Sequence, residues 1–200
     1  MRILIIRHGE SEADLLDVHE GRADFELTER GHRQAEAMAR YVKENYDVSV
    51  IYCSTLKRAR QTAEHLSEAT GIPVTVDERL MEFNNGLIAG LERSVADEKY
   101  PLVKNLPLHA SVYEQESMLE FRCRADYVLS KITSETDPEA TVAIVTHGGM
   151  INQLYRAFLR LPIDSDIGFA TGDTGIHEWR ISEGCRGVAR ANVTEHAKGI

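Results

Sequence analysis

Cysteine is scarce in this sequence. The three cysteines, Cys53, Cys123 and Cys185, are far apart and form neither a CxxC pair nor the ligand spacing of a zinc site. The pattern favours reduced thiols and an intracellular protein over a secreted domain held by disulfides. No HExxH or similar motif is present either, so we expect no metal site.

Long apolar runs are absent as well. No run approaches the length that crosses a membrane, and the N-terminal residues lack the hydrophobic core of a signal peptide. There is also no internal repeat, low-complexity tract or linker. We therefore expect one domain over residues 1–200, a cytoplasmic location and no membrane partner. A homodimer is left open.

Positive charge is in deficit. The chain has 23 Lys and Arg residues against 32 Asp and Glu residues, a formal net charge of −9. Its overall field would not attract nucleic acid or an anionic membrane surface, so no nucleic-acid partner is expected. A phosphorylated substrate would need a strong local cationic pocket.

Apolar and helical patterns alternate along the chain. Apolar residues make up 42% and charged residues 28%, as in ordinary globular proteins. Strands are predicted over 3–6, 48–52, 74–76 and 141–145, with later ones over 168–179 and 187–193, the last ones at an antiparallel edge. Helices are predicted from 29, over 56–71, 93–99 and 117–132, and after 149 as far as 161. This order predicts an α/β fold, with a mainly parallel central sheet and helices on both faces.

Helix caps and loops complete this outline. Thr28 is predicted to cap the helix from residue 29, Ser54 or Thr55 the next one, and Ser117 with Glu120 forms a capping box. Residues 11–30 and 77–91 are expected to be loops, the first with one short helical turn. Residues 102–116 are interpreted as a flexible insertion that could cover a pocket. The acidic run Glu114, Glu116 and Glu120 is interpreted as a solvated face.

Arg7 and His8 directly follow the apolar run 3–6. Ligands of open α/β sheets bind at the carboxyl ends of strands, so this pair puts a permanent cation beside a neutral imidazole in a binding position. Arg58 belongs to a helix that starts at the same edge. The guanidinium groups of two arginines can each bind two oxygens of an anion, and a neutral imidazole can attack phosphorus. His8 is therefore the predicted nucleophile of a phosphoryl transfer, and Arg7 and Arg58 are the predicted clamps.

Two further residues complete the predicted machinery. His147 follows the strand 141–145 and precedes Gly148 and an apolar helix, so its ring and the helix start can hold a phosphoryl oxygen. Glu82 lies in the loop 77–91 and is the predicted acid that protonates the leaving oxygen and later accepts a proton from water. The other histidines have no motif around them and are interpreted as surface or structural residues.

These residues lie in motifs that resemble the histidine phosphatase superfamily, also called the phosphoglycerate-mutase-like fold. The motifs follow one another in register over most of the chain: Arg7-His8-Gly9-Glu10-Ser11, residues 27–31, residues 54–63, Glu82 before Gly86, Glu116-Ser117, and residues 146–149. The resemblance implies a three-layer α/β/α sandwich, a phosphohistidine on His8, phosphate contacts from Arg7, Arg58 and His147, Glu82 as proton donor, and neither metal nor cofactor. The compact phosphatases of this family are the most similar in length.

The sequence departs from the family pattern near the predicted site. Asp14 stands where asparagine is usual, and Glu20 where many members have glutamine; Ile88 and Ala89 replace a usual tryptophan and glutamate. We predict that Ser11, Asp14, Glu20 and Gly148 line the substrate site. Asp14 and Glu20 are expected to disfavour a second phosphate or carboxylate and to suit leaving groups that carry hydroxyl or amine groups.

The sequence therefore predicts a phosphatase that acts on phosphomonoesters of small metabolites. A mutase, a protein phosphatase and a phospho-ligand binding module are alternatives with the same fold, and a metal hydrolase is one with different chemistry.

Overall fold

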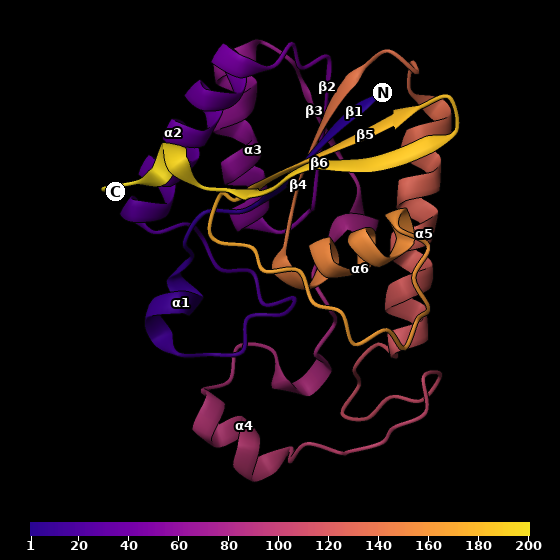
Figure 1. Ribbon diagram of the computed structural model, residues 1–200. Helices are drawn as coiled ribbons and strands as arrows, with labels where there is room; N and C mark the ends of the chain where they lie inside the picture. Colours follow the sequence, from indigo (N-terminus) through magenta and orange to yellow (C-terminus); the bar gives the residue numbers. More distant parts are fainter.

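One six-stranded sheet forms the centre of the molecule in the computed structural model, which describes residues 1–200 (Figure 1). The strands are β1 (Arg2–Arg7), β2 (Val50–Cys53), β3 (Val74–Val76), β4 (Thr141–Thr146), β5 (Ile176–Ser182) and β6 (Cys185–Val193). Their order in the sheet is β3-β2-β4-β1-β5-β6. The first four are parallel, and the hairpin β5-β6 adds two antiparallel strands beside β1. The predicted antiparallel edge is confirmed.

Helices cover the sheet on its two faces. They are α1 (Glu12–Leu16), α2 (Glu29–Asn45), α3 (Lys57–Thr70), α4 (Arg93–Lys99), α5 (Met118–Glu135) and α6 (Gly148–Phe158). Figure 1 shows α2 and α3 on one side of the sheet and α5 and α6 on the other, while α1, α4 and the long loops lie beyond one end. The prediction of a three-layer α/β/α sandwich is confirmed.

The alternation of side chains along β1 explains the two hydrophobic cores. Ile3 and Ile5 face the core formed with α5 and α6, whereas Leu4 and Ile6 face the core formed with α2 and α3. All four side chains are fully buried. A strand covered on both faces must be apolar at every position, which is why its sequence is a continuous run instead of an alternating one.

The helix starts agree with the sequence in two cases and differ in one. The Thr28 hydroxyl accepts a hydrogen bond from the N–H of Gly31, and Ser117 caps α5 together with Glu120, as predicted. The prediction that Ser54 or Thr55 caps α3 is wrong. Leu56 stands at the cap position, and the N–H of Lys57 donates instead to the Asp24 carboxylate at 2.7 Å, a partner from a distant loop.

The segment before β5 is also corrected. A strand was expected over residues 168–179, but β5 begins only at Ile176. Side-chain amides replace strand pairing in this segment: Asn152 bonds the N–H and C=O of Phe169, and Asn192 accepts from the N–H of Gly172. Local apolar content cannot reveal such partners, because both asparagines come from other elements.

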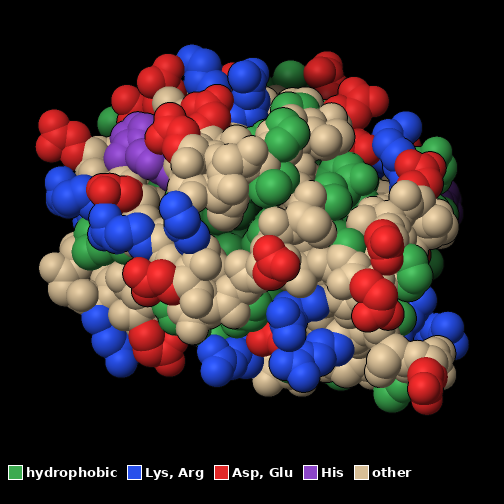
Figure 2. All heavy atoms as spheres, turned by 90° about the horizontal axis from the view of Figure 1, so that it is seen from above, with side chains coloured by type: hydrophobic (Ala, Val, Ile, Leu, Met, Phe, Trp, Pro, Cys, Tyr) green, Lys and Arg blue, Asp and Glu red, His purple; other side chains and the backbone are tan.

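Charges are mixed over the surface. On the face seen in Figure 2, Lys and Arg side chains are interspersed with Asp and Glu side chains around hydrophobic ones. None of the helices combines the length and the hydrophobicity that a membrane crossing needs. No group of three or more His, Cys, Asp and Glu side chains is arranged to hold a metal ion.

Candidate active site

Two neighbouring strands carry the two predicted site histidines to the same place. β1 and β4 pair in parallel with Arg7 opposite Thr146, so His8 and His147 follow side by side. Their rings are buried and their centroids are 5.1 Å apart. The backbone of His8 is held between strands as well, because its N–H donates to the Thr146 carbonyl and its carbonyl accepts from Thr174.

The His8 ring is oriented by its own loop. Its Nδ1 is 2.7 Å from the carbonyl oxygen of Gly9. A carbonyl can only accept, so Nδ1 carries the proton and Nε2 presents a lone pair. Burial, followed by the charges of Arg58 and Arg7, holds the pKa of His8 well below its usual range. The ring is therefore neutral, as an attacking imidazole must be.

Arg58 lies against that lone pair. Its Nε is 3.3 Å from His8 Nε2, and its two terminal nitrogens donate to the carbonyls of Ala23, at 3.0 Å, and Gly21, at 2.8 Å. The side chain is completely buried. These carbonyls belong to the loop that follows α1, so that loop fixes the guanidinium plane. A permanent cation is thereby held beside the predicted nucleophile.

Arg7 completes the cationic side of the site. Its Nη1 donates to the Thr171 carbonyl at 3.1 Å and lies 3.4 Å from the Asp173 carboxylate. Its Nε is buried and has no hydrogen-bond partner. Gly148 is adjacent: a Cβ placed there would lie 4.0 Å from Arg7 Nε. A buried N–H donor without a partner is a position where an anion oxygen would be stabilised.

His147 also has a free ring nitrogen. Its Nε2 is 2.8 Å from the Ser54 hydroxyl, which follows β2, whereas its buried Nδ1 has no partner. Burial and then the charge of Arg58 lower the pKa of His147 well below its usual range. The structure therefore favours a neutral His147 ring that forms hydrogen bonds over a charged one.

Glu82 lies against the start of α6, where Gly149 follows His147 by two residues. One carboxylate oxygen accepts from the N–H of Gly149 at 2.8 Å and the other from the N–H of Phe83 at 2.7 Å. A side chain at Gly149 would overlap the Glu82 carboxyl group, which explains a glycine there. The helix start was expected to attract the substrate, but one of its N–H groups is already bonded to Glu82.

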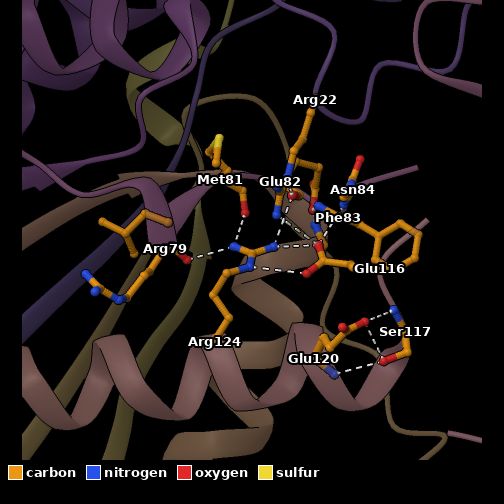
Figure 3. A network of polar contacts seen from close by, with 12 residues as sticks. Arg22, Arg79, Met81, Glu82, Phe83, Asn84, Glu116, Ser117, Glu120 and Arg124 are labelled. Carbon is orange, nitrogen blue, oxygen red and sulfur yellow. Dashed lines mark hydrogen bonds and ion pairs between the residues drawn. The ribbon is translucent and has the colours of Figure 1, made fainter. Parts of the chain in front are cut away.

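The loop that carries Glu82 is held by a guanidinium from α5 (Figure 3). Arg124 donates to the carbonyls of Arg79, Met81 and Glu82 at 2.6 to 3.1 Å, and to the Glu116 carboxylate at 2.7 Å. Glu116 also accepts from other donors of the same network, the N–H of Asn84 and the guanidinium of Arg22.

The interpretation of Glu116 as part of a solvated face is therefore wrong, since its side chain is 10% exposed and paired. The sequence alone does not reveal which charged side chains contact one another in the folded protein.

The three other predicted substrate residues lie together on the loop side of the site. The N–H of Ser11 donates to the Asp14 carboxylate at 2.9 Å, so exposed Asp14 closes the first turn of α1. Glu20 reaches further in: its Oε1 is 3.1 Å from Arg58 Nε, and Ser11 Oγ donates to it. Burial above all raises the pKa of Glu20.

The geometry thus brings together a neutral imidazole whose Nε2 accepts from the buried Arg58, the half-buried Arg7, and the Glu82 carboxyl group at the start of α6. The family model of the histidine phosphatase superfamily, branch 1, matches residues 3–194. This chain belongs to the histidine phosphatase superfamily.

Relatives in this superfamily include phosphatases and a mutase. The glucosyl-3-phosphoglycerate phosphatase of Mycobacterium tuberculosis is 30% identical over 81% of this chain and 77% of its own length. A 2,3-bisphosphoglycerate-dependent phosphoglycerate mutase of Cytophaga hutchinsonii is 32% identical over 88% of this chain and 87% of its own length. A solved mycobacterial glucosyl-3-phosphoglycerate phosphatase, in complex with inorganic phosphate, matches with a TM-score of 0.83, 26% identity and 98% coverage of each chain.

The predicted family and fold are therefore confirmed, while the roles assigned to single residues stay predictions. Sequence reasoning missed the partners that support the site: Asp173 beside Arg7, Ser54 beside His147, and Arg124 with Glu116 behind Glu82. Only Ser54 and Glu116 lie within motifs that the resemblance used.

A separate cavity of about 260 Å³ is lined by none of the predicted site residues. It is bounded by α4, by residues 102–115 and by His19, the residue before Glu20; Tyr100, Leu106 and Tyr113 are among its apolar walls. Asn85, three residues after Glu82, also lines it, and its buried Oδ1 has no partner. The cavity surface is mostly hydrocarbon, because Asn85 Oδ1 is buried against Gly21.

Proposed function

We propose that this protein is a metal-independent phosphatase that hydrolyses phosphomonoesters of small metabolites through a covalent phosphohistidine on His8. One observation carries the proposal most directly. The buried His8 ring is neutral, its Nδ1 proton is engaged by Gly9, and its Nε2 lone pair lies beside the Arg58 guanidinium. This is the arrangement that nucleophilic attack on an anionic phosphoryl group requires.

In the first step, the Nε2 lone pair forms a bond to phosphorus while the bond from phosphorus to the leaving oxygen breaks. Glu82 gives its proton to that oxygen, so the alcohol leaves neutral. Arg7, Arg58 and His147 hold the equatorial oxygens, whose charge redistributes as the group is transferred. Buried donors without partners, such as Arg7 Nε, support this assignment.

In the second step, water attacks the phosphohistidine from the side that the alcohol left. Glu82, now a carboxylate, accepts a proton from this water, the bond between phosphorus and Nε2 breaks, and His8 returns to its neutral form. Inorganic phosphate leaves. No step consumes an oxidant, a reductant or a metal.

The cavity beside Asn85 supports a place for the alcohol part of the substrate. Its apolar walls suit a leaving group with a hydrocarbon portion. The expectation of leaving groups that carry hydroxyl or amine groups stays a prediction.

The decisive experiment compares the purified protein with His8→Ala over a set of phosphorylated metabolites and phosphopeptides. We expect phosphate release from the small metabolites by the unchanged protein, also after chelation, and loss of release in His8→Ala. Exposed His109→Ala serves as the control and should match the unchanged protein. A radiolabelled phosphoryl group should stay on the quenched protein only when His8 is present. Activity that survives His8→Ala would refute the mechanism.

The mutase relative favours one alternative. In a mutase the phosphohistidine must return its phosphoryl group to a second alcohol instead of water. Incubation with a bisphosphorylated primer and a monophosphate separates the two functions: isomer formation that exceeds phosphate release would identify a mutase.

A further inference from the structure

Glu20 borders the place where a phosphoryl group must bind. Its carboxylate oxygens lie 3.1 Å from Arg58 Nε and 3.7 Å from His8 Nε2, and Ser11 Oγ donates to one of them. These are the groups that the proposed reaction assigns to phosphate. An acidic side chain thus lies beside the proposed phosphoryl site.

This position creates a conflict of charge. A phosphoryl group bonded to His8 Nε2 would place its oxygens next to the Glu20 carboxylate, and two anions at such a separation repel strongly in a buried site. An amide at this position would donate an N–H to a phosphoryl oxygen. A carboxylate has no hydrogen to donate, and only a carboxylic acid can do so.

The surroundings of Glu20 raise its pKa above the usual range of a glutamate. Burial raises its pKa most, and the carboxylate of Asp14 raises it further; the charges of Arg58 and Arg7 and the Ser11 hydrogen bond act in the opposite direction without cancelling the rise. The adjacent His8 ring is neutral and adds no charge. Incoming phosphate adds negative charge and so strengthens the tendency to bind a proton.

We propose that Glu20 takes up a proton when the phosphoryl group binds and then donates its O–H to a phosphoryl oxygen, which makes binding proton-coupled. The inference rests on the proposed phosphatase function and concerns the selectivity of the same site. The proton comes from solvent and returns to it when phosphate leaves, so the overall hydrolysis is unchanged. Binding weakens as the pH rises, because deprotonation of Glu20 then becomes the preferred state.

Calorimetry with inorganic phosphate tests this without any turnover. Titrations at one pH in buffers of different ionisation enthalpy count the protons taken up per phosphate bound. We expect Glu20→Gln to take up about one proton fewer than the unchanged protein and to bind phosphate at least roughly tenfold more tightly at pH 8. Glu44→Gln, the same chemical change at an exposed position of α2, should behave as the unchanged protein. Equal proton uptake in Glu20→Gln and the unchanged protein would overturn the proposal.

The pH dependence of kcat/KM gives a second test. Since the active form carries protonated Glu20, kcat/KM of the unchanged protein should fall as the pH rises, and this fall should move to higher pH in Glu20→Gln. Ser11→Ala should move it in the same direction, because it removes a hydrogen bond that stabilises the Glu20 carboxylate. This variant leaves Glu20 in place should Glu20→Gln fail to fold.

The two tests separate this proposal from the function on which it rests. Active proteins with identical pH profiles would refute the role of Glu20 and leave the phosphatase standing. Failure of the unchanged protein and of the variants to bind phosphate would refute the phosphoryl site itself, and the role of Glu20 with it.

Discussion

At the scale of single residues, short backbone contacts prepare the proposed chemistry. The Gly9 carbonyl selects the tautomer of His8, and the N–H groups of Phe83 and Gly149 orient the carboxyl group of Glu82. These residues could be predicted because a polar side chain at the end of an apolar strand, or in a loop near it, stands out in the sequence. The tautomer of His8 could not be predicted, since it depends on the conformation of Gly9.

Replacement of Glu82 tests its role as the acid. Glu82→Gln should lower kcat/KM for an alkyl phosphate by about 10²–10⁴-fold, because the alkoxide then leaves without a proton. The loss should be much smaller for p-nitrophenyl phosphate, whose phenolate is a stable anion. Steady-state rates with the two substrates measure this difference.

Glu78 provides the matched control for Glu82→Gln. It is an exposed glutamate of the same loop, and Glu78→Gln should leave the rates with both substrates unchanged. An equal loss for alkyl and aryl phosphates in Glu82→Gln would mean that Glu82 positions the substrate and does not protonate the leaving group.

At the scale of elements, packing between motifs explains why certain glycines are required, which no single motif explains. Gly9 follows β1 and Gly31 lies in the first turn of α2; a Cβ on Gly9 would lie 2.6 Å from the carbonyl oxygen of Gly31. The two glycines are therefore required by the close contact of two segments. Helices and strands could be predicted from their apolar periods, but contacts such as Asp24 with the start of α3 could not, because nothing local in the sequence specifies them.

The network behind the Glu82 loop gives a prediction at this scale. Arg124→Met leaves the Glu116 carboxylate without its strongest partner, and we expect it to lower the free energy of unfolding by about 3 kcal/mol. It should also lower kcat, because three carbonyls of the loop lose their donor. Adding Glu116→Gln should recover part of the stability and none of the kcat.

Arg79→Met is the matched control for Arg124→Met. Arg79 lies in the same network view, but its side chain is 37% exposed and pairs with Asp77, so its loss should change stability by less than about 1 kcal/mol. Denaturant unfolding and steady-state rates measure these effects. Strictly additive stability losses in the double variant would contradict the proposed pairing of Arg124 with Glu116.

At the scale of the whole molecule, buried histidines link stability to pH. His177 is buried between Tyr155 and Thr171, with hydrogen bonds to both side chains, and burial lowers its pKa to about 4. The unfolded chain binds a proton at His177 near pH 6.5, while the folded protein does so only near pH 4. The unfolded state therefore binds more protons within this window, and stability falls as the pH falls.

Denaturant unfolding between pH 7 and pH 4 measures this dependence. His177 should contribute a loss of roughly 3 kcal/mol by about pH 4. His8 and His147 act in the same direction, since their pKa values are lowered too. The slope with pH should therefore become shallower, but not vanish, in His177→Gln. An unchanged slope in this variant would contradict the prediction.

The overall architecture could be predicted from the sequence because every core strand and helix carries its own apolar pattern. The hairpin β5-β6 was located less well: its edge strand is mostly exposed, and residues 168–175 are held by asparagine side chains in place of strand pairing. The residues that line the cavity were beyond prediction, because residues 102–115 form their side of it without a regular period.

The hydrogen bonds on either side of the His8 backbone also determine how the protein can move. Amide exchange at His8 requires β1 to separate from β4 between two buried core strands, an opening close to global unfolding. Residues 102–115, which belong to no helix or strand, can rearrange without that opening. Rearrangement of this cavity wall can therefore occur on a faster timescale than any displacement of His8.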